Sequence, residues 1–128
     1  MSQYRGKNTS IAVRSMIRML IPLSKQSDAL EILGAICAQI QIDPNCLWCR
    51  IYRGAEEQRA IMIEECWSND ESLLQHLRSN AYHRVLLVVE MAEEPPEIRF
   101  DDILQSSGIE KIENARKRPM QSKFNDSQ

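Results

Sequence analysis

The sequence predicts an α+β fold of the ferredoxin-like type, with a four-stranded antiparallel sheet and helices on one face. Segments of alternating apolar residues and segments with apolar residues three or four apart occur in the order strand, helix, strand, strand, helix, strand. That order is the split βαβ sandwich. The 128 residues, 43% of them hydrophobic, suffice for one packed core and are too few for two.

The first two elements are expected in the N-terminal third of the chain. Apolar side chains alternate over residues 11–21, which predicts a strand that Pro22 ends. Ser24 or Ser27 is expected to cap the following helix, whose apolar residues recur at helical spacing until residues 43–45 end it.

Three further strands are expected. Residues 46–53 and 60–67 are rich in strand-favouring residues and are separated by a short charged segment, which predicts a hairpin. Residues 97–104 form the fourth strand, after two prolines. Beyond Gly108, residues 109–113 fit either a short strand or a helical turn.

The helical region between the third and fourth strands is expected to be broken. Ser68 or Asn69 can cap its start. Its leucines and its later valines form two apolar stripes that are out of phase, so a straight helix could not bury both. We expect a break near residues 79–80, with a short helix that presents His76 and a longer one up to about Met91.

The ends of the chain are polar. Residues 1–10 are expected to be a flexible arm and residues 117–128 a disordered basic tail, which leaves residues 11–116 as the domain. The first residues lack the apolar core of a signal peptide, and the apolar runs are shorter than a membrane span. A soluble, cytoplasmic protein without membrane contact is expected.

The charge balance argues against a nucleic-acid-binding protein, and the cysteine spacing argues against a metal or redox site. Sixteen basic against 18 acidic residues give a net charge of -2, so a nucleic-acid partner is not indicated. Without a signal peptide, Cys37, Cys46, Cys49 and Cys66 are interpreted as reduced thiols. Residues three apart on a strand point to opposite faces, so Cys46 and Cys49 are not expected to form a metal or redox site. No metal is expected.

The sheet is expected to form a homodimer through its second face. Three of the strands carry large side chains on both sides, and the helices cover only one side. With no further helix available, the same sheet of a second copy is the expected cover.

Three residues near the end of the third strand are candidate site residues. Trp67 either walls a pocket or is a core aromatic residue. His76 lies at the border of its helix's leucine stripe, where it could act as a base, donor or ligand, or be structural.

Glu65 shares a strand face with Trp67, so it is expected to point inward and to need a partner. An arginine of a neighbouring strand is expected as that partner, with Arg14, Arg18 and Arg50 as candidates. A structural ion pair and a role in proton transfer both remain open.

These residues resemble part of a known family, the antibiotic biosynthesis monooxygenase (ABM) domain, which also occurs in small quinol monooxygenases and haem-degrading enzymes. The similarity covers about Ile11 to Leu104. It is carried by Glu65-Cys66-Trp67-Ser68, Leu73, His76-Leu77-x-Ser79, Tyr82 and Pro96-Glu97-Ile98.

The resemblance implies a dimeric α/β barrel with a pocket between the sheet and the helices of each subunit. Some members oxidise polycyclic phenols or quinols with dioxygen and no prosthetic group. A cofactor-independent monooxygenase acting on a small aromatic or quinol-like molecule is therefore expected. Its catalytic residues would be Trp67 and His76, and Tyr82, Glu65 and Arg50 would bind the substrate.

One departure from the phenol-oxidising pattern leaves an alternative open, and the haem-degrading branch is compared separately. Ile63 stands where phenol-oxidising members have an asparagine, which favours a non-catalytic binding or interaction dimer that keeps the fold. In the haem-degrading branch, a tryptophan stands at the position of His76 and the iron-binding histidine at Leu86. Haem degradation is therefore disfavoured.

Overall fold

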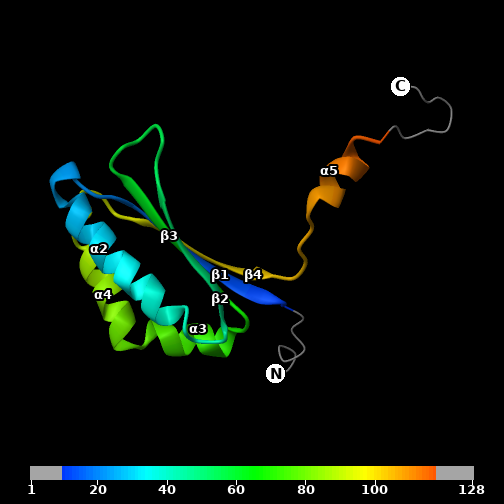
Figure 1. The fold of residues 1–128 in the computed structure, drawn as a ribbon, viewed down its shortest axis with the longest axis horizontal. Coiled ribbons are helices and arrows are strands. Elements are labelled where there is room, and N and C mark those ends of the chain that lie inside the picture. The colour runs from blue at the N-terminus through cyan, green and yellow to red at the C-terminus, as the bar shows by residue number, and fades with distance from the viewer. Residues whose placement is uncertain (1–9, 118–128) are drawn as a thin grey trace.

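The computed structural model describes residues 10–117, which form one antiparallel sheet with helices on one face (Figure 1). The strand order is β2-β3-β1-β4. This arrangement confirms the predicted α+β, ferredoxin-like fold class. In chain order the elements are β1 (Ala12–Leu20), α2 (Leu23–Ile40), β2 (Cys46–Arg53), β3 (Ala60–Trp67), α3 (Asp70–Leu77), α4 (Asn80–Val89), β4 (Glu97–Ile103) and α5 (Ile109–Ala115).

The core lies between the sheet and helices α2, α3 and α4. Ile17 of β1 is opposite both Ile63 of β3 and Ile98 of β4 in the strand register, so their side chains share the helix-covered face. The alternation then places every second residue of the central strands inside. The core includes Val13, Ile17, Met19, Leu33, Ile36, Ile61, Ile63, Val85 and Val88.

The start of α2 differs from the prediction. Neither Ser24 nor Ser27 caps this helix, because it begins directly after Pro22, which has φ -53° and no side-chain cap bond. Proline fixes a φ that suits the entry to a helix, so the strand passes into the helix without a polar cap. Both serines lie inside the helix.

The predicted break between α3 and α4 is confirmed, and two caps define it. The Asn69 side chain accepts a hydrogen bond from the Ser72 N–H at 2.8 Å and begins α3. Ser79 Oγ accepts from the Tyr82 N–H at 3.2 Å and donates to the His76 carbonyl at 2.7 Å. A single hydroxyl therefore ends one helix and starts the next.

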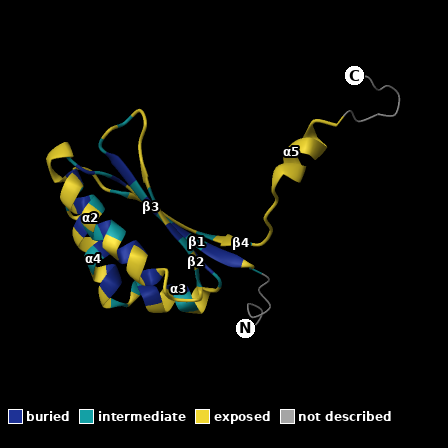
Figure 2. Cartoon of the chain, in the orientation of Figure 1, coloured by how far each residue is buried: buried dark blue, intermediate teal, exposed yellow. Residues whose placement is uncertain are grey.

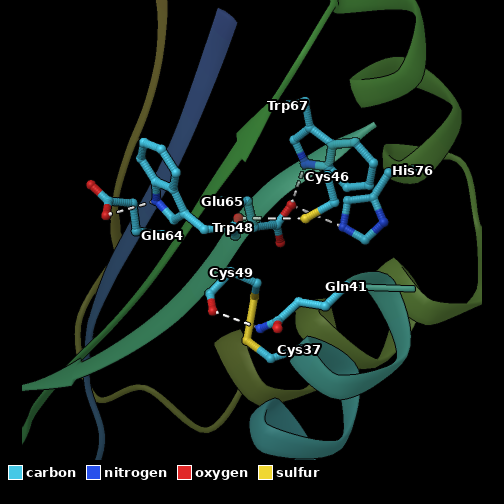
Figure 3. Close-up of a disulfide and its surroundings, with 9 residues drawn as sticks. All are labelled: Cys37, Gln41, Cys46, Trp48, Cys49, Glu64, Glu65, Trp67 and His76. Atoms are coloured by element: carbon cyan, nitrogen blue, oxygen red, sulfur yellow. Dashed lines mark hydrogen bonds and ion pairs between the residues drawn. A yellow bond between two sulfur atoms is a disulfide. The ribbon is translucent and has the colours of Figure 1, made fainter. Parts of the chain in front are cut away.

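The expectation of four reduced thiols is wrong, because Cys37 and Cys49 form a disulfide (Figure 3). Cys37 lies on the inward side of α2 and Cys49 on the helix side of β2, with their Cα atoms 5.4 Å apart. Packing across the layers brings together residues that sequence spacing does not pair. Cys46 and Cys66 are free thiols, and burial raises the pKa of Cys46 to about 11.

The other face of the sheet carries no helix of the described residues 10–117 (Figure 2). We call it the open face. Trp48, Arg50 and Tyr52 of β2 project from it, and the Glu64 carboxylate accepts hydrogen bonds there from Trp48 Nε1 at 3.3 Å and from Tyr52 Oη at 3.2 Å. Large side chains on this face are therefore left uncovered by their own chain.

The C-terminal segment leaves the body of the protein after β4. Residues 104–117, including α5, are all exposed (Figures 1 and 2). After Gly108, where a short strand or a helical turn was expected, the chain is helical. Apart from Ser10 and Lys117, the expected N-terminal arm and C-terminal tail lie outside the described residues.

None of the helices described between residues 10 and 117 combines the length and the apolar content that crossing a bilayer requires.

Candidate functional site

A cavity of about 330 Å³ lies between the C-terminal end of α2, the end of β3 and the junction of α3 with α4. One indole and one imidazole line it together with a set of amides and hydroxyls. The lining residues are Gln39, Ile40, Asp43, Trp67, Ser72, Gln75, His76, Ser79, Asn80 and Ala81. Such a lining suits a small molecule that has an aromatic part and several polar groups.

Trp67 and Glu65 are held together on the helix side of β3. The two residues are two apart on the strand, so their side chains point the same way. Trp67 Nε1 donates a hydrogen bond to Glu65 Oε1 at 2.9 Å, and only 1% of Trp67 and 2% of Glu65 are exposed. The indole is a core side chain with a satisfied N–H, and it also forms one wall of the cavity.

His76 joins this pair from α3 (Figure 3). It is 6% exposed, its ring centroid lies 4.9 Å from that of Trp67, and its Nε2 lies 3.0 Å from Glu65 Oε1. The Nε2 direction is not aligned for a hydrogen bond, so the contact is a close approach of imidazole and carboxylate. Nδ1 is then the ring nitrogen left to exchange a proton with a bound molecule.

The partners of Glu65 differ from the prediction. Among residues 10–117 no arginine pairs with this carboxylate, because Arg14, Arg18 and Arg50 alternate onto the open face while Glu65 faces the helices. Arg14 instead pairs with Asp101 at 3.4 Å. A buried carboxylate needs donors, and the indole N–H of Trp67 takes that role, while the imidazole of His76 lies in close contact with the same oxygen.

Tyr82 completes the aromatic cluster from the first turn of α4. Its ring meets that of His76 edge-on, with centroids 5.2 Å apart. Burial, and secondarily the charge of Glu65, raises the pKa of Tyr82 to about 12. The phenol therefore stays neutral around physiological pH, and it lies behind His76 instead of lining the cavity.

Arg50 lies apart from the other predicted site residues. It is exposed on the open face, where its guanidinium carbon lies 4.5 Å from the centroid of the Trp48 ring. The structure thus brings together Trp67, Glu65, His76 and Tyr82 and leaves Arg50 on the opposite side of the sheet.

Several cavity residues were missed by the sequence reasoning, among them Gln39, Asp43 and Gln75. They lie at the end of α2 and on α3, and their amide and carboxylate types are common on surfaces. The turn predicted at residues 43–45 could have indicated that the end of α2 lies near the site. Ser68 N donates to the Asn45 carbonyl at 2.9 Å, which joins that turn to the end of β3.

Within residues 10–117, no group of three or more histidine, cysteine or carboxylate side chains is arranged to hold a metal ion.

The chain thus has a ferredoxin-like sheet with an aromatic cluster beneath its helices. No family model matches it. No curated protein matches it either.

Solved structures do match, and several of them are described as ABM proteins. A putative antibiotic biosynthesis monooxygenase from Nitrosomonas europaea is 14% identical, with a TM-score of 0.68 over 77% of this chain and 96% of that one. Another, from Caulobacter crescentus CB15, is 12% identical, with a TM-score of 0.69 over 81% and 100% of the two chains.

A conserved protein from Methanosarcina mazei Go1 is 19% identical, with a TM-score of 0.68 over 74% of this chain and 95% of that one. At these identities the matches establish the fold. The chain has the fold of ABM proteins, as the sequence resemblance predicted.

Proposed function

We propose that this chain is a monooxygenase that oxidises a quinol-like or phenolic small molecule with dioxygen. The observation that supports it is His76, which lines the cavity with its Nε2 held 3.0 Å from the buried carboxylate of Glu65. An imidazole placed in this way can act as a base, because the carboxylate stabilises the imidazolium that forms.

The proposed reaction begins with proton transfer from a substrate hydroxyl to His76 Nδ1. The resulting phenolate is electron-rich and passes electrons to dioxygen. For a hydroquinone the balance is one substrate plus one O₂ giving one hydroxyquinone and one water. One oxygen atom forms a bond to a ring carbon, the O–O bond breaks, and the second oxygen leaves as water with two protons from the substrate.

The remaining residues have supporting roles in this proposal. Trp67 offers a ring against which an aromatic substrate can pack, and Glu65 positions both Trp67 and His76. Tyr82 packs edge-on against the imidazole of His76. The polar lining provides hydrogen bonds to substrate oxygens.

The proposal includes a homodimer through the open face. Four large side chains project from this face, and no helix in the part of the chain that the structure describes covers them: Met16, Met62, Trp48 and Tyr52. The same sheet in a second copy would bury them, in a two-fold symmetric contact.

Oxygen uptake with a panel of reduced quinols and hydroxylated naphthalenes tests the activity. We expect turnover by the unmodified protein and a loss of about 10²–10⁴-fold in kcat for His76→Ala, the usual contribution of a general base. His83→Ala is the matched control, because His83 is the exposed histidine on α4. Equal activity in both variants, with folding verified by circular dichroism, would contradict the role of His76.

A non-catalytic binding protein is the second candidate. The contact between the Trp67 and His76 rings favours it, since a substrate cannot enter between two rings whose centroids are 4.9 Å apart. Ile63, on the same face of β3 as Trp67, also departs from the phenol-oxidising pattern. Calorimetric binding of a hydroxylated aromatic without oxygen uptake for any compound of the panel would support this candidate.

A further inference from the structure

The disulfide between Cys37 and Cys49 lies next to the part of α2 that lines the cavity. Cys37 is one turn of helix before Ile40, which is one of the lining residues. Cys49 is opposite Glu65 in the register of β2 and β3, so both side chains project to the helix side. Figure 3 shows the disulfide on the same side of the sheet as Glu65 and His76. The bond therefore joins the helix that forms one wall of the cavity to the sheet that carries Glu65.

The end of α2 lacks the features that usually stabilise a helix C-terminus. Its C-cap is Gln41 in a right-handed conformation, and no basic residue lies in its last turn. The residues that follow, 41–45, are all exposed. The Gln41 side-chain amide donates a hydrogen bond to the Cys49 carbonyl at 3.0 Å, beside the disulfide itself. The attachment of this cavity wall to β2 is thus concentrated at the disulfide.

Reduction by a dithiol makes this attachment reversible. In a first exchange step, a thiolate of the reductant attacks one sulfur, the bond between Cys37 and Cys49 breaks, and the expelled cysteine takes up a proton. In a second step, the other thiol of the reductant closes its own disulfide and releases the remaining cysteine as a thiol. Two electrons and two protons thus pass from the dithiol to the protein.

The two thiols cannot keep the positions of the bonded sulfurs. Sulfur atoms that are not bonded stand at van der Waals distance, well beyond the length of a disulfide bond. Cys37 and Cys49 are only 7% and 6% exposed, and a close-packed interior has no free volume for this movement, so a neighbouring element must shift. β2 is held by its ladder of hydrogen bonds to β3. The last turn of α2 is therefore the part that moves, together with the lining residues Gln39 and Ile40.

We propose that the Cys37–Cys49 disulfide is a redox switch for ligand binding in the cavity. The oxidised protein holds the wall formed by Gln39 and Ile40 in place and binds the aromatic ligand, and the reduced protein binds it more weakly. The inference rests on the ligand class of the proposed function and is independent of the reaction with dioxygen. Coupling of this kind is reciprocal, so the bound ligand also makes the disulfide harder to reduce.

Calorimetry with naphthol, a hydroxylated aromatic that is not a quinol, tests the coupling. The oxidised protein and the protein reduced with dithiothreitol are titrated under argon. We expect the dissociation constant to rise at least fivefold on reduction, within the range usual for coupled sites. Cys37→Ser with Cys49→Ser should match the reduced protein and should not respond to dithiothreitol. Cys46→Ser is the matched control and should keep the full response, because that thiol is free.

Reciprocity gives a second measurement on the unmodified protein. The fraction of reduced protein is measured in mixtures of reduced and oxidised dithiothreitol, with and without naphthol, by thiol labelling and mass spectrometry. A ligand that binds the oxidised form tenfold more tightly lowers the reduction potential by about 30 mV at saturation. If the double serine variant does not fold, this titration and the reduced unmodified protein supply the comparison.

Amide hydrogen exchange provides a measurement that needs no ligand. The Gln41 amide donates to the Cys37 carbonyl at 3.1 Å, and reduction should accelerate its exchange at least tenfold while the amide of Ile17 in β1 is unchanged. Faster exchange at Gln41 without naphthol binding would support the switch and contradict only the ligand class. Unchanged exchange at Gln41, equal acceleration at Ile17, or equal naphthol affinity of the two forms would overturn the proposal.

Discussion

At the scale of single residues, Glu65 is the group on which the buried cluster depends. Its carboxylate accepts the Trp67 N–H and lies against His76 in a region closed to water. Glu65→Leu would leave the indole N–H buried without an acceptor. We therefore expect a loss of about 1–3 kcal/mol in the free energy of unfolding, measured by urea denaturation.

Glu65→Gln should be milder, because the amide oxygen still accepts from the indole. Glu64→Gln is the control on the open face, where the partners Trp48 and Tyr52 are not enclosed. A Glu65→Leu protein as stable as the Glu64→Gln protein would contradict this account.

The raised pKa of Tyr82 predicts that the free energy of unfolding falls at alkaline pH. Its pKa rises from 10.0 to about 12 on folding. The unfolded chain therefore ionises first, so the stabilisation is complete below pH 10 and is lost as the pH rises toward 12. Thermal melting from pH 9 to pH 12 should show a fall that is smaller in Tyr82→Phe. Tyr52→Phe should keep the full fall, and identical curves for both variants would exclude Tyr82 as its source.

At the scale of elements, the junction of α3 and α4 determines where His76 and Tyr82 point. Ser79 both ends α3 and caps α4, so Ser79→Ala should cost about 1 kcal/mol of unfolding free energy. Ser79→Asp keeps an acceptor at the cap and should cost less. Chemical denaturation measures both, and equal losses would show that the cap bond is not the cause.

The disulfide joins α2 to β2 next to the cavity. Removing it with Cys37→Ser and Cys49→Ser together, or with dithiothreitol, should lower the unfolding free energy by about 2–4 kcal/mol, given a sequence separation of 12. Cys46→Ser is the control, since that thiol is free. If dithiothreitol leaves the denaturation midpoint of the unmodified protein unchanged, the two sulfurs are not bonded in solution.

These elements also show what the sequence can predict. The break near Ser79 followed from two apolar stripes out of phase, which is a local property of about twenty residues. The disulfide and the partners of Glu65 were not predicted, because they depend on how α2, α3 and β3 meet across the core. The direction of Glu65 was predicted correctly from strand alternation, and the same alternation excludes the arginines that were expected beside it.

At the scale of the whole molecule, the two sides of the sheet have different tasks in our proposals. The helix side holds the cavity with Trp67 and His76, and the open side holds the surface for a second copy. Arg50 was assigned wrongly because the sequence did not show which face of the sheet it occupies. As a charged strand residue it was predicted to bind the substrate. Its position over Trp48 instead places it on the open face, the surface proposed for association.

The two tryptophans lie on these opposite sides, which has a spectroscopic consequence. Trp67 is enclosed near the cavity, while Trp48 lies on the open face beneath Arg50. In Trp67→Phe protein, the remaining emission should shift to shorter wavelength as protein concentration rises and copies associate. In Trp48→Phe protein, emission should be insensitive to dilution and should respond to aromatic ligands. The protein thus carries one fluorescent reporter for each process.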